Sequence, residues 1–119
     1  MDKESLRRLA VDAIDELKGS DVVELDVHAL TDVTDCLVIA SGRSDRHVKS
    51  LAQNVIEKAK AAGVKPLGVE GLDDGDWVLV DLCDVVVHVM QPETRDYYQI
   101  EKLWTRMDSD APTQQSTAP

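Results

Sequence analysis

The sequence predicts a single α/β domain in which a mixed β-sheet is flanked by helices. The chain has 119 residues, enough for one hydrophobic core, and 43% of them are hydrophobic. Segments whose apolar residues recur at helical spacing occur along the chain together with short strand-like segments. The last two strand-like segments are separated by a short turn, which favours an antiparallel hairpin within the sheet.

The first helix is predicted over residues 3–18. Its apolar residues recur at helical spacing, charged residues occupy the other face, and Gly19 stands where a C-terminal cap belongs. The next segment, DVVELDV, alternates apolar and acidic residues over positions 21–27. This alternation predicts a strand with one solvated face, near an edge of the sheet.

The middle of the chain predicts a strand, a turn and a helix. Residues 35–42, DCLVIASG, are apolar on both strand faces and end in small residues, as a central strand does before a sharp turn. Ser44 is placed to cap the following helix, whose regular apolar series ends at Gly63. Two further strands, within 76–81 and 84–90, are predicted to pair as the hairpin.

Pro92 suits the first turn of a last helix. On that helix Tyr97, Ile100 and either Leu103 or Trp104 are spaced to lie along one side, which we expect to be buried, while Tyr98 faces elsewhere. From position 108 the chain is too polar to bury a core. We therefore expect a domain over residues 1–107 and a disordered tail over residues 108–119.

The charge of the chain restricts its partners. It has 13 Lys and Arg against 23 Asp and Glu, a formal net charge of -10. This balance disfavours direct, sequence-specific binding of nucleic acid and would attract a basic protein. The N-terminal segment is charged throughout, which predicts neither a signal peptide nor a membrane span. We expect a cytoplasmic protein without membrane association.

No metal, cofactor or catalytic residue is expected. Cys36 and Cys83 lie in apolar sequence without the spacing of zinc ligands, so both are predicted to be buried thiols. Asp81 and Asp84 flank a turn, but carboxylates on one strand face should be two positions apart to hold the metal ions of nucleotidyl transfer. The loop at Gly42 lacks the glycine spacing of a phosphate-binding loop.

His88 interrupts the valines of the last strand, on the face opposite Val87 and Val89. No serine or cysteine nucleophile is identifiable beside it, so a catalytic role has no support, and a lone strand histidine is usually structural. The segment after this strand contains Tyr98 and Trp104. Exposed Trp, Tyr and Arg side chains anchor protein interfaces, which makes a docking face the main alternative to a structural role.

Three segments together resemble the Iojap family, the RsfS ribosomal silencing factors: DCLVIASGRSDRHVKSLAQNV, GVEGLDDGDWVLVDLCDVVVHVM and TRDYYQIEKLW. The resemblance covers roughly residues 3–106 and implies a fold related to nucleotidyltransferases without a known enzymatic activity. This chain departs from the family pattern at Leu82 and Cys83, which occupy a turn where the family tends to have glycine before Asp84.

The resemblance implies binding to the large ribosomal subunit through its fourteenth protein. Subunit joining would be blocked sterically and translation repressed when nutrients are short. A homodimer is implied when the protein is free of the ribosome. The alternatives are a large-subunit assembly factor, as in mitochondrial relatives, and less favourably a nucleotidyltransferase-like enzyme using Asp81, Asp84 and loop 41–44. The expected docking residues are Trp77, His88, Arg95, Tyr98, Glu101 and Trp104.

Overall fold

The protein, described here by a computed structural model over residues 2–27, 34–100 and 102, forms an α/β fold. The described strands form a five-stranded sheet in the order β1-β2-β5-β4-β3. β2 and β5 are parallel and the other pairs are antiparallel, so the predicted mixed sheet is confirmed. The elements are α1 (Lys3–Glu16), β1 (Ser20–Asp26), β2 (Cys36–Ser41), α2 (Asp45–Ala61), β3 (Gly68–Glu70), β4 (Trp77–Asp81), β5 (Val85–Met90) and α3 (Pro92–Tyr98).

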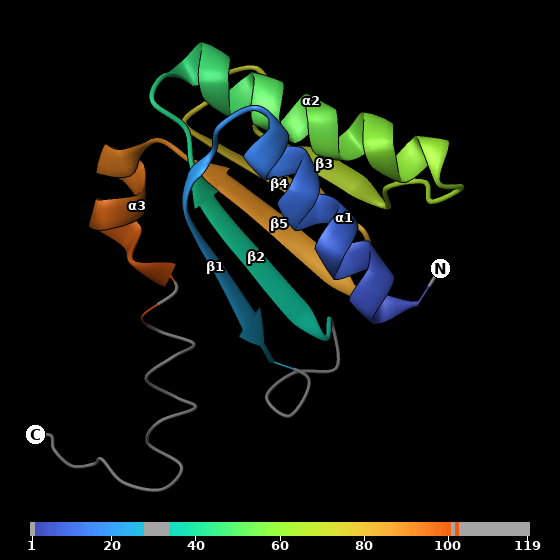
Figure 1. Cartoon of the computed structure of the whole chain (residues 1–119). Helices are drawn as coiled ribbons and strands as arrows, with labels where there is room; N and C mark the ends of the chain where they lie inside the picture. The colour runs from blue at the N-terminus through green and yellow to red at the C-terminus, as the bar shows by residue number, and fades with distance from the viewer. Residues whose placement is uncertain (1, 28–33, 101, 103–119) are drawn as a thin grey trace, which may run out of the picture.

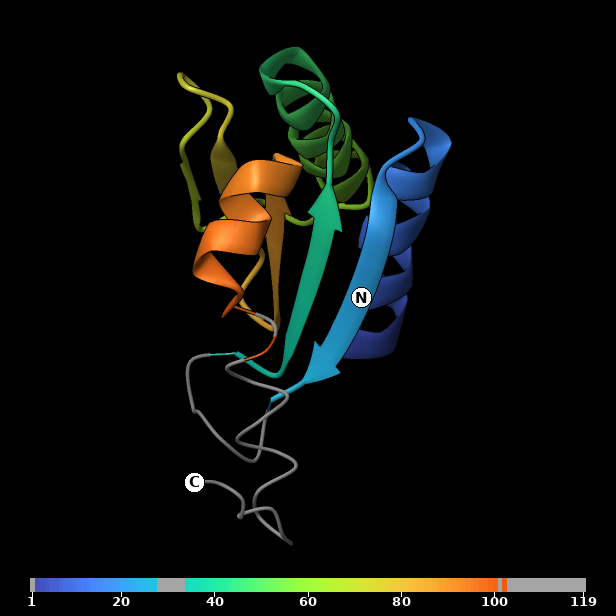
Figure 2. The ribbon, with the colours of Figure 1, turned by 90° about the vertical axis from the view of Figure 1, so that its left-hand side faces the viewer.

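The helices cover the sheet unequally. α1 and α2 pack on one face, whereas the short α3 lies on the other, at the end where β2 and β5 finish (Figures 1 and 2). Alternate residues of the central strands, such as Val38 and Val87, enter the main core beneath α1 and α2. Their neighbours Leu37 and Val86 form a smaller cluster on the opposite face. α3 therefore lies over one end of this second face, where β2 and β5 finish.

The predicted strand, turn and helix in the middle of the chain are confirmed. All six residues of β2 are buried, and β2 lies between β1 and β5. The Ser44 hydroxyl caps α2 by accepting a hydrogen bond from the His47 backbone N–H at 3.1 Å. α2 is tied to α1 by Asn54, whose Nδ2 donates to the Ala13 carbonyl at 2.8 Å. Gly63 follows α2 with a positive φ of 85°.

Gly19 takes part in the cap predicted at the end of α1, because its backbone N–H donates to the Ile14 carbonyl at 2.9 Å. The left-handed residue there is Lys18, with φ 65°, and Gly19 follows it. A Cβ at Gly19 would lie 2.3 Å from Ile14 Cγ2, so this glycine is required by close packing against the last turn of α1. Gly19 therefore closes α1 both by its backbone N–H and by its lack of a Cβ, but the sequence pattern did not indicate that the left-handed residue would be Lys18.

Only one of the two cysteines is buried as predicted. Cys36 is 5% exposed, and burial raises the pKa of its thiol to about 11. Cys83 is exposed, so its predicted burial is wrong. It lies in the turn between β4 and β5 with φ 78°, where its backbone N–H donates to Asp81 Oδ1 at 2.8 Å. This left-handed conformation disfavours any side chain with a Cβ.

We expect Cys83→Gly to raise the free energy of unfolding by about 0.5–1 kcal/mol. Relief of left-handed strain contributes about 1–2 kcal/mol, and the greater freedom of glycine in the unfolded chain offsets about half of it. Urea denaturation measures the change. Cys83→Ala is the control, because it removes the thiol and keeps the Cβ, and its stability should stay near that of the wild-type protein. Equal stabilisation by both substitutions would contradict the backbone explanation.

Two further expectations concern the ends of the domain and the membrane. No helix within the described ranges is both long and apolar enough to cross a membrane. The predicted disordered tail over residues 108–119 lies outside the described residues. The division of the chain at residue 107 therefore stays a prediction.

Candidate protein-docking site

Four of the six predicted docking residues lie in the described part of the chain, and they come together around α3. Trp77 begins β4 and is paired with Met90, the last residue of β5. His88 lies two residues earlier on β5, with its side chain on the same face as that of Met90. Arg95 and Tyr98 belong to α3. The remaining two, Glu101 and Trp104, lie outside the described residues.

The aromatic side chains form a continuous series from β4 to the surface of α3. The ring centroids of Trp77 and Tyr98 are 5.0 Å apart, with a tilt of 49° between the rings. Tyr98 in turn meets Tyr97 edge-on, with a centroid separation of 4.9 Å. Tyr98 is 54% exposed and Tyr97 is 80% exposed. Two of the chain's four aromatic side chains are therefore presented to solvent side by side.

The predicted burial of Tyr97 is wrong, and the length of α3 explains why. The helix has seven residues and ends at Tyr98, because Gln99 is left-handed with φ 49°. Helical spacing therefore does not continue from Tyr97 to Ile100, and the residue of α3 that is buried is Arg95. The third member of the predicted stripe, Leu103 or Trp104, lies outside the described residues. Tyr97 is thus a surface residue that the sequence pattern assigned to the core.

His88 is buried, with 8% of its surface exposed. Its Nδ1 accepts a hydrogen bond from the indole Nε1–H of Trp77 at 3.0 Å. Burial lowers the pKa of His88 from 6.5 to about 4, so the imidazole is neutral at physiological pH. Because Nδ1 is the acceptor, the neutral ring carries its proton on Nε2.

Arg95 fixes α3 to the sheet instead of presenting its charge at the surface. It is 8% exposed, and its Nη1 donates to Ser41 Oγ at 2.9 Å, at the end of β2. The residue before α3, Gln91, is anchored as well. Its Nε2 donates to Asp76 Oδ1 at 2.9 Å, and its backbone N–H donates to the Asp76 carbonyl at 3.0 Å. α3 is thereby held to both β2 and the start of β4.

The carboxylates considered for metal binding are not gathered into a metal site. Asp81 accepts the hydrogen bond from the Cys83 backbone, and Asp84 is exposed beyond the turn. Across residues 2–27, 34–100 and 102, no group of three or more His, Cys, Asp and Glu side chains is placed to hold a metal ion. Among the described residues, the arrangement around α3 offers aromatic contact surface and no recognisable set of reacting groups.

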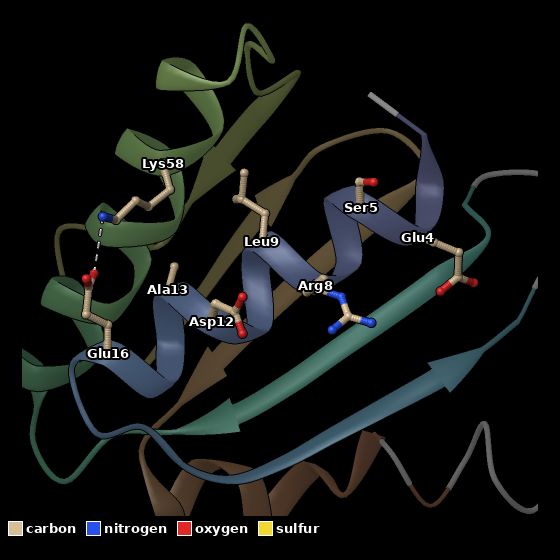
Figure 3. Close-up of a pocket in the computed structure, with 8 residues that line it drawn as sticks. All are labelled: Glu4, Ser5, Arg8, Leu9, Asp12, Ala13, Glu16 and Lys58. Atoms are coloured by element: carbon tan, nitrogen blue, oxygen red, sulfur yellow. Dashed lines mark ion pairs between the residues drawn. The ribbon is translucent and has the colours of Figure 1, made fainter.

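A separate groove of about 590 Å³ runs along α1, on the helix-covered side of the sheet. Leu9 and Ala13 line it, with charged side chains of both signs around them, including Arg8 and an ion pair between Lys58 and Glu16 at 3.5 Å (Figure 3). The groove is open and its charges are mixed. It lacks the exposed aromatic residues found on α3.

Comparisons with known proteins agree over nearly the whole chain. The family model described as Ribosomal silencing factor during starvation (RsfS) matches residues 1–119. The ribosomal silencing factor RsfS of Chromobacterium violaceum is 49% identical over 104 residues, which cover 87% of this chain and 85% of that protein. The RsfS of Bacillus subtilis is 38% identical over 112 residues, covering 94% and 92% of the two chains.

More distant and structural relatives extend the comparison. The mouse protein named mitochondrial assembly of ribosomal large subunit protein 1 is 32% identical over 105 residues, covering 86% of this chain and 46% of that protein. A crystal structure of a Chromobacterium violaceum protein superposes with a TM-score of 0.87 at 48% identity, covering 88% of each chain. The chain therefore belongs to the ribosomal silencing factor family, RsfS.

Proposed function

We propose that this protein binds the large ribosomal subunit in the cytoplasm and sterically blocks joining of the small subunit, so that translation is repressed when nutrients are limited. Membership of the silencing family supports this function. The main observation in favour of this docking site is the aromatic series from Trp77 through Tyr98 to Tyr97, in which both tyrosines are exposed. Such a surface suits a protein partner, because Tyr and Trp supply large contact areas on rigid side chains.

The charge of the protein supports a basic partner, and we propose the fourteenth protein of the large subunit. The net charge of -10 would speed its approach to a basic protein and disfavour unwanted contacts with ribosomal RNA. This mode of action needs no catalytic group, metal or cofactor, since the protein acts by covering a surface that the small subunit requires. A homodimer of the free protein remains part of the proposal.

We expect the protein to bind large and not small subunits, and its association rate to fall as salt is raised. Screening should slow association by about tenfold between roughly 0.05 and 0.5 M monovalent salt at constant Mg²⁺. Sedimentation with separated subunits measures selectivity, and stopped-flow mixing measures the rate. Adding the protein before the small subunit should also leave free subunits where the control forms joined particles. Equal binding to both subunits would contradict the proposal.

A second candidate function is assembly of the large subunit, which the name of the mouse relative favours. Both functions would use the same docking face. Sucrose gradients of cells lacking the protein separate them. An assembly factor should leave immature large-subunit precursors when it is missing, whereas a silencing factor should leave mature subunits and more joined particles during starvation.

A further inference from the structure

His88 is a polar side chain in apolar surroundings. It lies on β5, the central strand of the sheet, and its cross-strand neighbours are Ile39 on β2 and Leu79 on β4. Burying an imidazole there costs free energy that an aliphatic side chain would not cost, unless its polar atoms are hydrogen-bonded. The Nδ1 atom is bonded to the Trp77 indole at 3.0 Å. The hydrogen bond that compensates for the burial of His88 is therefore made with Trp77, a residue of the candidate docking site.

We propose that His88 is a positioning residue for docking: its Nδ1 holds the Trp77 indole in one orientation, and the indole in turn supports Tyr98 on α3. This role rests on the proposed function, because it explains how the aromatic face is kept ready for the large subunit. His88 itself is too buried to contact a partner over more than a small area. Its contribution passes through Trp77.

The geometry gives Trp77 two restraints that act on different parts of its ring. The indole N–H points to His88, which limits rotation of the ring, and the centroid of the same ring lies 5.0 Å from that of Tyr98. The His88 ring is also within 5.9 Å of the indole, tilted by 47°. A side chain held in its bound orientation loses less entropy when a partner binds. Because the indole N–H of Trp77 is already hydrogen-bonded to His88, a partner would contact the surface of the indole ring.

The alternative is a purely structural role, in which the His88 side chain only fills volume in the sheet. Two substitutions separate volume from hydrogen bonding. His88→Leu introduces an apolar side chain of similar size and removes the hydrogen-bond acceptor. His88→Asn is smaller, but its Oδ1 stands one bond from Cγ, as Nδ1 does in histidine, and can accept the same indole proton. If His88 acts only by packing, His88→Leu should be the milder substitution. If His88 positions Trp77, His88→Asn should be the milder one for binding.

The test measures large-subunit binding and thermal stability on the same variants. We expect His88→Leu to melt near the wild-type protein yet bind about tenfold more weakly, and His88→Asn to melt lower yet bind within about threefold of it. Trp77→Phe, which has no N–H, provides the matched background. There His88→Leu should cause no further loss of binding, as a double-mutant cycle requires. Equal loss of binding in both His88 variants would overturn the proposal. So would the same roughly tenfold loss of binding by His88→Leu in the Trp77→Phe background.

A second readout tests the positioning role without the ribosome. In ¹⁵N NMR spectra of the free protein, the Trp77 indole signal, assigned by its loss in Trp77→Phe, should shift and exchange faster in His88→Leu but not in His88→Asn. An unchanged indole signal in His88→Leu would overturn the role of His88. If the wild-type protein does not bind large subunits, the proposed function fails, and the NMR result alone then decides whether His88 orients Trp77.

Discussion

Tyr98→Ala is expected to weaken binding to the large subunit by about 1–4 kcal/mol, roughly 5-fold to 1000-fold, while leaving the melting temperature nearly unchanged. The reason is the position of the side chain. It is 54% exposed, so its truncation removes little buried area from the core, but it joins Trp77 to the exposed Tyr97. Subunit-binding assays and thermal melts on the same preparation measure the two effects.

Leu67→Ala is the matched control for this experiment. Leu67 is an apolar side chain that is 69% exposed, and its backbone N–H bonds the carbonyl of Asp81, at the end of β4 remote from Trp77. Its truncation should alter neither binding nor stability measurably. If Leu67→Ala weakens binding as much as Tyr98→Ala, the effect is not specific to α3. A Tyr98→Ala protein that melts much lower and binds normally would assign Tyr98 to the fold.

The second large effect is acid destabilisation through His88. Its pKa is about 4 in the folded protein and 6.5 without burial, so between these values the unfolded chain binds a proton that the folded protein does not. The free energy of unfolding therefore falls as the pH is lowered from 6.5 to 4. Because each tenfold difference in proton affinity between the two states corresponds to about 1.4 kcal/mol, the loss reaches about 3 kcal/mol. Urea denaturation at a series of pH values measures it.

Comparison with His88→Leu isolates this contribution, because leucine does not titrate and the variant should lose less stability over that range. The carboxylates of Asp2 and Glu16 act at lower pH. Hydrogen bonds to Ser5 and Asn54, respectively, lower their pKa values below the ordinary 3.8 and 4.5. The stability that they contribute is present above those values and is lost as the pH falls through the lowered pKa values. Parallel profiles for both proteins would contradict the role of His88.

Much of the fold was predictable because apolar periodicity reports local structure directly. The buried series of α2, the all-apolar β2 and the β4 to β5 hairpin all followed from spacing over a few residues. The errors arose where conformation depends on one backbone residue. Gln99 ends α3 in the left-handed region and leaves Tyr97 exposed, and Cys83 takes the same region in a turn. Neither residue type signals this conformation in the sequence.

The candidate site was predictable in its residue types and not in its contacts. Trp77, His88 and Tyr98 were predicted docking residues, but the bond from Trp77 to His88 depends on the register of the hairpin. The bond between Arg95 and Ser41 joins residues 54 positions apart. Such contacts form only in the assembled sheet. Sequence patterns over neighbouring residues therefore could not reveal that Arg95 is buried and joins α3 to β2.

The shortness of α3 limits how the proposed docking to the large subunit could be blocked with a peptide. Seven residues are far fewer than the roughly 12–15 that an isolated helix needs to be even marginally stable in water. α3 is held in place by the hydrogen bond from Arg95 to Ser41, at the end of β2, and by the hydrogen bond from Gln91 to Asp76, just before β4. A synthetic peptide copied from α3 would lack both ties and the indole beneath Tyr98. An antagonist would therefore have to reproduce the hairpin and the helix as one constrained unit.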